Sequence, residues 1–274
     1  MKLLLALGVL AVALLVGLGS LEHKMLYYPI KFPAGEWNTA WFPGMLEDCA
    51  FTTADGIRLH GWFARRDSEI PAEAPYTLLF FHGNAGNITH RLENVAYLIQ
   101  SGIQVFIFDY RGYGKSQGRP TEDGLYRDAL AAYEYVVARP DVDAEKIVFF
   151  GRSLGGAVAV QLATQRPCDK LILESTFTSA TDMAAILFPG LPVNMLVRSR
   201  FDSLGAIAAL RMPLLIIHGT QDEVIPFELG QRLFAAANAP KYWYAIDGAG
   251  HNDTYAVGGR AYFTRIFQFI QTAR

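Results

Sequence analysis

A serine in the string GRSLG at positions 151–155 could act as a nucleophile, because the string matches the GxSxG pattern. It follows an apolar run and opens a helix-like segment, so Ser153 is expected on a tight turn from a strand to a helix. There its Oγ would project at the carboxyl end of a sheet, and the backbone N–H of Leu154 could stabilise an oxyanion. The alternative is a glycine-rich junction with an inert serine, which the flanking strand and helix make the weaker interpretation.

A serine hydroxyl needs a base within hydrogen-bond reach, and His251 is the best candidate. It lies in GAGHND at 248–253, after the apolar run Tyr242–Ile246, where a loop can reach back over the sheet edge. His82 and His218 each end an apolar run and precede glycine, so they are expected to support loops.

A carboxylate can orient the histidine and stabilise its cation, and Asp222 is the expected residue for this. It follows the apolar run Leu214–Ile217, and the order Ser153, Asp222, His251 is typical of a strand–turn–helix serine hydrolase. The alternative for Asp222 is a turn or helix-capping carboxylate. Four other acidic residues compete for the role: Glu174, Asp202, Glu223 and Asp253. Glu174 is the strongest of them, because it ends an apolar run.

The glycine-rich string HGNAGN at 82–87 follows another apolar run and could place a second backbone N–H beside Ser153. Asn84 is the expected donor, although a plain turn is also consistent with the string. The string GKS at 114–116 resembles the end of a phosphate-binding loop, but Asp109 stands where the first glycine is required.

No zinc-binding pattern and no cluster of acidic residues and histidines suggests a metal site, and no cofactor is expected. The two cysteines, Cys49 and Cys168, form no CxxC pair. A disulfide between them cannot be inferred from the sequence.

The elements that must position these residues alternate between short apolar runs and helix-like segments. Leu46–Thr53 and Ile57–Arg65 resemble two strands joined by a hairpin-type turn. The later runs show no polar alternation, which is typical of parallel strands covered on both faces: Thr77–Phe81, Val105–Phe108, Ile147–Phe150, Leu171–Leu173, Leu214–Ile217 and Tyr242–Ile246. Helix-like segments lie between and after them, around 88–101, 121–138, 154–166, 203–210, 226–238 and 259–273. The pattern predicts an α/β fold with about eight mostly parallel strands and helices on both faces.

The remaining regions complete the predicted organisation: residues 1–20, 21–44 and a catalytic domain over 45–274. The chain has 274 residues, 51% of them hydrophobic, which is enough for one α/β domain with a large core. Its formal net charge of −2 and the lack of a basic block argue against nucleic-acid binding. Residues 177–202 contain Pro189, Gly190 and Pro192, and we expect either a minimal lid or an ordinary excursion there.

The N-terminus is a separate object. Leu3–Gly19 is apolar throughout, near the lower length limit for a membrane-spanning helix, and Lys2 precedes it. We expect an uncleaved membrane anchor, with a cleaved signal peptide and export as the alternative. The aromatic residues of 21–44 could then lie at lipid headgroups or pack on the domain. The side of the membrane and the oligomeric state stay open.

Five strings together resemble the alpha/beta-hydrolase superfamily over nearly all of residues 45–274. They are HGNAGN at 82–87, DYRGYGKS at 109–116, GRSLGG at 151–156, GTQDEVIP at 219–226 and GAGHND at 248–253. The chain is similar to a subgroup of membrane-anchored hydrolases that includes cell-polarity proteins and depalmitoylating thioesterases. It is also similar in pattern to serine aminopeptidases and prolyl-oligopeptidase-like domains. It lacks the HGGG string of some lipases and esterases.

The resemblance implies that Ser153, Asp222 and His251 are nucleophile, acid and base, with Asn84 and Leu154 forming the oxyanion hole. We expect hydrolysis of a carboxylic ester or thioester, on a small-molecule or acylated substrate. A peptidase with the same triad is one alternative. A membrane-attached organising protein with little turnover is another, against which the intact triad argues.

Overall fold

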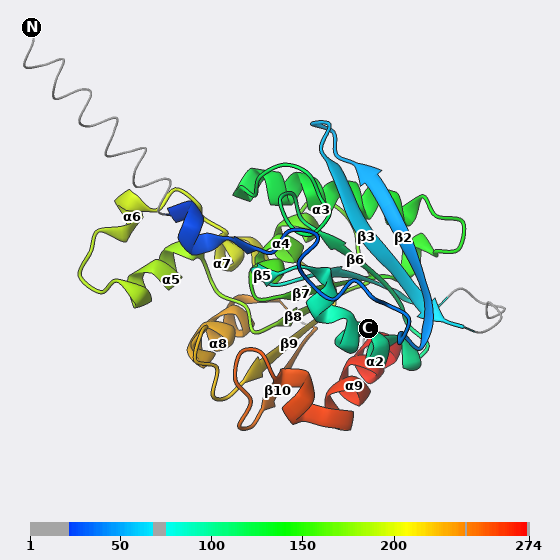
Figure 1. The fold of residues 1–274 in the computed structure, drawn as a ribbon. Helices are drawn as coiled ribbons and strands as arrows, with labels where there is room; N and C mark the ends of the chain where they lie inside the picture. The colour runs from blue at the N-terminus through cyan, green and yellow to red at the C-terminus, as the bar shows by residue number, and fades with distance from the viewer. Residues whose placement is uncertain (1–21, 68–74, 239, 273–274) are drawn as a thin grey trace, which may run out of the picture.

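The structure, a computed structural model, describes residues 22–67, 75–238 and 240–272. Its centre is an eight-stranded sheet with the order β10-β9-β8-β7-β4-β6-β3-β2 (Figure 1). The strands are β2 (Gly44–Thr52), β3 (Arg58–Arg66), β4 (Thr77–Phe81), β6 (Gln104–Asp109), β7 (Ile147–Arg152), β8 (Lys170–Glu174), β9 (Leu214–Gly219) and β10 (Lys241–Ile246). β3 runs antiparallel to both of its neighbours, and the other pairs are parallel. The predicted strand number and direction are confirmed.

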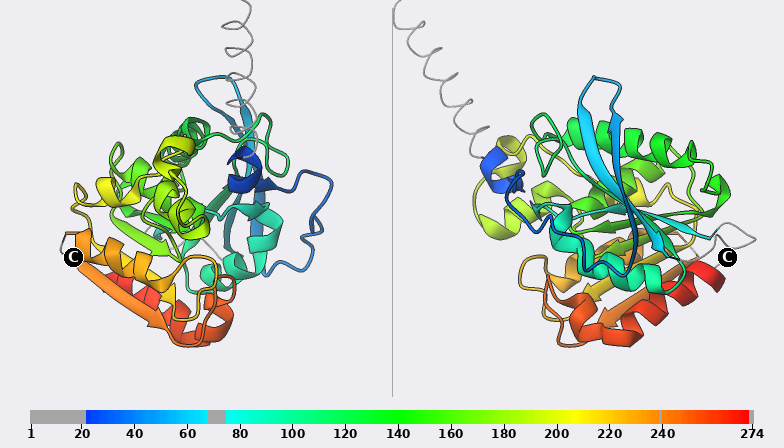
Figure 2. Two further views of the ribbon diagram at one scale, coloured as in Figure 1. Left: turned by 90° about the vertical axis from the view of Figure 1, so that its left-hand side faces the viewer. Right: turned by 45° about the vertical axis from the view of Figure 1, so that its right-hand side comes forward.

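Helices cover both faces of this sheet (Figures 1 and 2). The helices are α2 (Leu92–Gln100), α3 (Glu122–Val137), α4 (Leu154–Ala163), α5 (Ala180–Leu187), α6 (Val193–Leu196), α7 (Ser203–Ile207), α8 (Phe227–Ala236) and α9 (Thr254–Thr272), with short 3₁₀ turns η1 (Ile88–Arg91) and η2 (Ala144–Lys146). α9 is kinked at Gly259.

The central strands have a core on each side, which explains their uninterrupted apolar sequence. Every residue of β4, β6, β7, β8 and β9 is buried. Because successive side chains point to opposite faces, Leu79 and Phe81 join the core under α3, α4 and α8, whereas Leu78 and Phe80 join the core under α2 and α9. The uninterrupted apolar runs in the sequence therefore reflect strands that are covered on both faces.

The parallel strands end at one edge of the sheet, and the candidate residues follow those ends. His82 follows β4, Ser153 follows β7, and Asp222 lies three residues after β9. Asp109 and Glu174 are themselves the last residues of β6 and β8. Ligand and catalytic sites of open α/β sheets lie at this edge.

The segment before β2 runs along the domain and pairs with it. β1 (Tyr28–Pro29) pairs with β5 (Ala85–Gly86), inside the HGNAGN loop, and Lys31 forms a bridge to Gly114. Its rings differ in environment, because Tyr27 and Phe42 are buried whereas Tyr28, Phe32 and Trp41 are more than half exposed. The division of the chain at residues 20 and 44 stays a prediction.

The structure contradicts the predicted attachment to a membrane by one N-terminal helix. Within 22–67, 75–238 and 240–272, every helix is too short or too polar to cross a membrane. The apolar run Leu3–Gly19, on which the prediction rests, lies outside the described residues.

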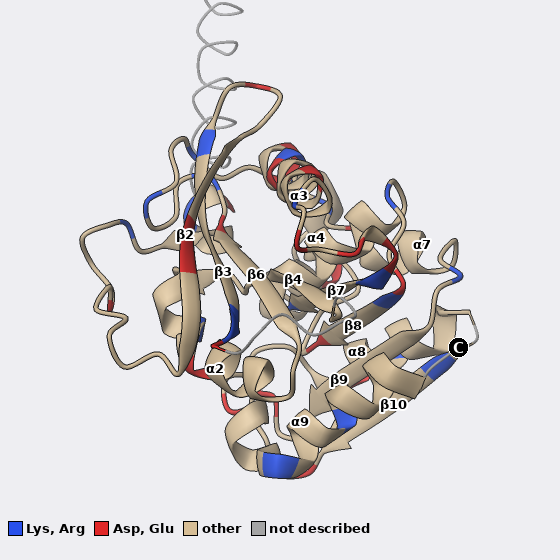
Figure 3. Cartoon of the chain, turned by 90° about the vertical axis from the view of Figure 1, so that its right-hand side faces the viewer, with Lys and Arg blue, Asp and Glu red and all other residues tan. Residues whose placement is uncertain are grey.

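Charged residues are interspersed rather than grouped on the face that Figure 3 shows. Acidic and basic positions both occur along α3, and the acidic Glu47 and Asp48 of β2 lie beside the strand that ends with Arg65 and Arg66. The irregular stretch after β8 contains the short helices α5 and α6 (Figure 1).

Candidate active site

Ser153 sits on the turn that joins β7 to α4, as its motif predicts. Its backbone has φ 54° and ψ −122°, a left-handed conformation that costs a non-glycine residue on the order of 1–3 kcal/mol. Two hydrogen bonds to the end of β8 hold it there: the Ser153 N–H donates to the Glu174 carbonyl (2.9 Å), and the Thr176 hydroxyl donates to the Ser153 carbonyl (2.8 Å). A Cβ on Gly155 would lie 2.0 Å from the Phe81 carbonyl oxygen, so this turn requires glycine there.

His251 lies between the serine and the predicted acid. Its Nε2 is 3.1 Å from Ser153 Oγ, and its Nδ1 is 2.8 Å from Asp222 Oδ2 and 3.0 Å from Oδ1. The three residues are 6–9% exposed. The spacing suits proton transfer from the serine hydroxyl to the imidazole, with the carboxylate binding the opposite ring nitrogen.

Asp222 is held as a charged acceptor by its surroundings. Its Oδ1 accepts the N–H groups of Val224 (3.0 Å) and Ile225 (2.8 Å), and His218 Nε2 is 3.3 Å from its Oδ2. Burial alone would raise the pKa of Asp222, but the hydrogen bonds from His218 and His251 outweigh it and hold that pKa well below its usual value. His218 supports this loop, since its Nε2 also donates to the Ile225 carbonyl (3.0 Å).

The HGNAGN loop passes directly beside the serine. A Cβ built on Gly83 would lie 3.3 Å from Ser153 Cβ and 3.9 Å from Ser153 Oγ. The next residue is fixed through its side chain, because Asn84 Oδ1 accepts the Tyr28 N–H (3.3 Å) and the Tyr113 hydroxyl (3.2 Å). On the other side of the serine, Leu154 begins α4, whose N-terminus carries partial positive charge.

Comparisons with known proteins identify the family of this chain. Residues 72–201 match the family described as "Serine aminopeptidase, S33". The "Alpha/beta hydrolase domain-containing protein WAV2" of Arabidopsis thaliana is 40% identical, over 96% of this chain and 91% of that protein. An uncharacterized protein of Mycobacterium tuberculosis is 39% identical over 97% of this chain and 95% of its own length.

The chain belongs to the alpha/beta-hydrolase family. Membership supports hydrolase activity and confirms the resemblance that the five strings predict. Among solved structures, the Pyrococcus furiosus esterase Pf2001 superposes with a TM-score of 0.73 over 89% of this chain and 98% of that chain. At 22% sequence identity, this likeness shows a shared alpha/beta-hydrolase fold.

The four rival carboxylates make other contacts in this alpha/beta hydrolase. Asp202 caps α7 by accepting the Gly205 N–H (2.8 Å), and Asp253 accepts the Gly250 N–H (2.7 Å). Glu223 accepts the His251 N–H (3.2 Å). Glu174 binds the hydroxyl groups of Thr254 and Tyr262. Of the five candidate acids, only Asp222 contacts the His251 ring within the described part of the chain.

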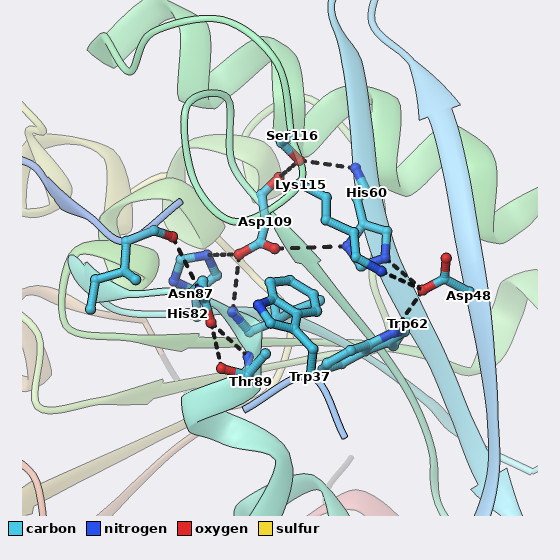
Figure 4. Close-up of polar contacts among 12 residues, drawn as sticks. Trp37, Asp48, His60, Trp62, His82, Asn87, Thr89, Asp109, Lys115 and Ser116 are labelled. Carbon is cyan, nitrogen blue, oxygen red and sulfur yellow. Dashed lines mark hydrogen bonds and ion pairs between the residues drawn. The ribbon is translucent and has the colours of Figure 1, made fainter. Parts of the chain in front are cut away.

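A second buried cluster lies behind the HGNAGN loop (Figure 4). Asp109 is at its centre: its Oδ1 accepts the Ile88 N–H (3.0 Å), and His82 and His60 flank it at 4.0 and 3.8 Å. His60 Nε2 is 2.7 Å from Asp48 Oδ1, on the exposed side. Burial raises the pKa of Asp109. The cluster therefore ties the start of η1, just after the loop, to β6 and β3.

Two residues of these networks were not foreseen as parts of the site. Arg152, inside the GxSxG string, donates from Nη2 to the His251 carbonyl (2.8 Å). Asp109, which the sequence presents only as a departure from a phosphate loop, supports the loop beside Ser153. The usable signal is a charged residue at the end of a buried strand, since such a charge needs a partner.

The described residues contain no group of three or more His, Cys, Asp or Glu side chains arranged to hold a metal ion. Cys49 is buried and Cys168 is partly buried, and both are free thiols. Burial raises the pKa of Cys168 to about 12, so this thiol is a poor nucleophile at neutral pH.

Proposed function

We propose that this alpha/beta hydrolase cleaves a carboxylic ester or thioester through an acyl-enzyme, with Ser153 as nucleophile, His251 as base and Asp222 as acid. The observation that carries the proposal is the continuous chain of contacts from Ser153 Oγ to His251 Nε2 (3.1 Å) and from His251 Nδ1 to Asp222 Oδ2 (2.8 Å). No cofactor is needed for this chemistry.

Each step of the proposed mechanism combines the making or breaking of a bond with the transfer of a proton. Ser153 Oγ attacks the carbonyl carbon while its proton moves to His251 Nε2, and Asp222 stabilises the imidazolium. The tetrahedral intermediate then expels the alcohol or thiol, which takes the proton from His251. Water, deprotonated by the same nitrogen, then attacks the acyl carbon. The bond from that carbon to Ser153 Oγ breaks, the carboxylic acid leaves, and His251 returns the proton to Ser153 Oγ. The backbone N–H groups of Leu154 and Asn84 donate hydrogen bonds to the negatively charged carbonyl oxygen, both in the formation and in the hydrolysis of the acyl-enzyme.

A groove beside the short helices that follow β8 supports the hypothesis that the substrate carries an apolar acyl group. The groove, of about 230 Å³, has Ala180, the first residue of α5, in its lining. Its other lining side chains are mostly aliphatic or thioether groups and include Met25, Met183 and Leu187. Such a surface favours a hydrocarbon chain over a charged leaving group.

Peptide-bond hydrolysis by the same triad is the second candidate, because the family matched by residues 72–201 is described as a serine aminopeptidase. Purified protein assayed on a series of p-nitrophenyl esters, acyl thioesters and aminoacyl p-nitroanilides distinguishes the two. A higher kcat/KM for the esters or thioesters supports the first proposal, and a higher value for the aminoacyl amides replaces it with the second.

Labelling by a fluorophosphonate probe tests the proposed nucleophile directly. Wild-type protein should label and Ser153→Ala should not; equal labelling of the two would overturn the proposal.

His251→Ala should lose on the order of 10³-fold or more in kcat/KM. Asp222→Asn should be strongly impaired because the histidine loses its charged partner, and full activity would remove Asp222 from the triad. Cys168→Ala serves as the control, since its buried thiol has no part in the mechanism.

A further inference from the structure

Arg152 connects the serine turn to the histidine loop. It is the last residue of β7, directly before Ser153, and it is 4% exposed. Its Nη2 donates to the backbone carbonyl of His251 at 2.8 Å. The residue adjacent to the proposed nucleophile therefore binds the backbone of the proposed base, 99 positions later in the chain.

Glu174 holds Arg152 from the neighbouring strand. The two residues are register partners on β7 and β8, and Arg152 Nε is 3.4 Å from Glu174 Oε1. The Glu174 backbone carbonyl also accepts the Ser153 N–H. A guanidinium can serve a carbonyl and a carboxylate at the same time because its donors form a planar fork, which a lysine ammonium does not provide.

The carboxylate of Glu174 is bound in turn by the helix that follows His251. Thr254, the first residue of α9, donates its hydroxyl to Oε1, and Tyr262 donates to Oε2 at 2.5 Å. Burial, reinforced by Glu174 itself, raises the pKa of Tyr262 well above its usual value, so this phenol stays a neutral donor. His251 is thus held from both ends: Glu223 accepts its N–H at 3.2 Å, and Arg152 binds its carbonyl.

We propose that Arg152 is a positioning residue, which fixes the His251 backbone relative to Ser153 and is itself aligned by Glu174 and the start of α9. The inference rests on the proposed function, in which His251 is the base. A buried ion pair contributes little net stability compared with apolar residues of similar size. In this position the pair acts on geometry rather than on stability, because it sets the distance between the strained turn at Ser153 and the loop that carries His251.

The test compares Arg152→Met and Arg152→Lys with Arg111→Met. Arg111 is a matched control, because its side chain is 8% exposed, against 5% for Arg152. It is paired with the buried Asp128 at 2.8 Å, and its other ion-pair partner is Asp55 rather than a triad residue. For each variant, kcat and KM are measured on a p-nitrophenyl ester, and kcat is divided by the folded fraction from circular dichroism.

If the inference holds, Arg152→Met lowers kcat about 10²-fold per folded molecule, because a misplacement of about 1 Å in a catalytic group has an effect of that size. Its KM stays within about threefold, since no substrate contact is removed. Arg152→Lys restores part of kcat, because its ammonium can donate to the His251 carbonyl. Arg111→Met loses stability but keeps the wild-type kcat per folded molecule.

An Arg152→Met enzyme with wild-type kcat per folded molecule overturns the inference and assigns the pair a structural role. If Arg152→Met does not fold, Thr254→Val decides instead, because it removes one donor to Glu174 at similar side-chain volume. A severalfold fall in its kcat supports the inference, and an unchanged kcat overturns it. A wild-type enzyme no more active than Ser153→Ala overturns the proposed function as well, which distinguishes that failure from a failure of Arg152 alone.

Discussion

Two buried carboxylates stand on opposite sides of β7, and they are bound in different ways. Glu174, at the end of β8, receives donors on both oxygens, from Thr254 and Tyr262, with Arg152 beside it. Asp109, at the end of β6, receives the Ile88 N–H on Oδ1, whereas its Oδ2 has no hydrogen-bond partner among the described protein groups. Both side chains are completely buried.

The difference shows how each carboxylate supports the site. Glu174 pairs with Arg152 and accepts both of its hydroxyl donors from α9, and under our proposal it thereby helps to position His251. Asp109 faces the unpaired ring nitrogens His60 Nδ1 and His82 Nε2, and burial raises its pKa (Figure 4). A carboxyl group in such surroundings favours its neutral form. The same replacement, carboxylate by amide, should therefore have opposite consequences at the two positions.

Glu174→Gln should have the largest effect on stability. The amide leaves the Arg152 guanidinium buried without a compensating charge, which costs about 3–5 kcal/mol in the free energy of unfolding. Urea unfolding at pH 7 measures it, with Glu134→Gln as control, because that carboxylate is an exposed partner of Arg166. A loss below about 1 kcal/mol would mean that Arg152 finds another partner, and the contrast with Asp109 would disappear.

Gly114→Ala should be the next most costly change, and it probes the crowded side of Asp109. A Cβ at this position would lie 1.9 Å from Asp109 Oδ2, and the residue has φ +46°. Overpacking and the left-handed backbone together cost roughly 2–4 kcal/mol. In an Asp109→Ala background the steric part is removed, so the same substitution should cost about 1–2 kcal/mol less. Equal costs in the two backgrounds, measured by a double-mutant cycle, would show that the two side chains do not meet.

Much of this architecture could be predicted from the sequence, because it depends on local patterns. Apolar runs without polar alternation indicate strands buried on both faces, and the GxSxG string between such a run and a helix indicates the turn at Ser153. Asp222 and His251 were found from their positions after β9 and β10. His251 contacts Ser153 and Asp222 contacts His251, while their catalytic roles stay proposals.

The partners of the buried charges could not be predicted, because they depend on which strands are neighbours. Glu174 was recognised as an acidic residue at a strand end, but its pairing with Arg152 follows from the adjacency and register of β7 and β8. Likewise, the two-residue strand Tyr28–Pro29 is too short to show a period, so its pairing with the HGNAGN loop was not foreseen. The first contact joins residues 22 positions apart and the second joins residues 57 positions apart.

The pH dependence of stability tests the surroundings of Asp109, because the adjacent His82 is buried. Burial, with the nearby Arg91, lowers the pKa of His82 from 6.5 to about 3. Between these values the unfolded chain binds the proton that the folded protein excludes, so stability falls as the pH decreases from about 6.5 toward about 3. By pH 5 the contribution is about 2 kcal/mol, at 1.36 kcal/mol per pH unit. The free energy of unfolding measured from pH 7 to 5 should depend less on pH in His82→Gln, and an unchanged slope would contradict this assignment.

Asp109→Asn should have the smallest effect, and its sign is the informative part. The pKa of Asp109 is raised in the folded protein, so its contribution to stability is full below the unfolded pKa and is lost as the pH rises through the folded pKa. At neutral pH an amide avoids that loss. With His60 Nε2–H donating to Asp48, His60 Nδ1 is an acceptor 3.8 Å from Asp109 Oδ2, so a side-chain shift of under about 1 Å would let the amide Nδ2–H of the variant donate to it.

The Asp109→Asn variant should therefore be as stable as wild type, or more stable by up to about 1 kcal/mol, at pH 7. Its advantage should shrink as the pH falls toward 4, because a carboxyl with the ordinary pKa of 3.8 then begins to bind a proton in the unfolded chain as well. Urea unfolding at the two pH values measures this, beside Glu174→Gln as the matched amide. A loss of 3 kcal/mol or more at pH 7 would mean that Asp109 is a compensated charge like Glu174. The HGNAGN loop and the loop that carries His251 would then be held by the same kind of interaction, not by different ones.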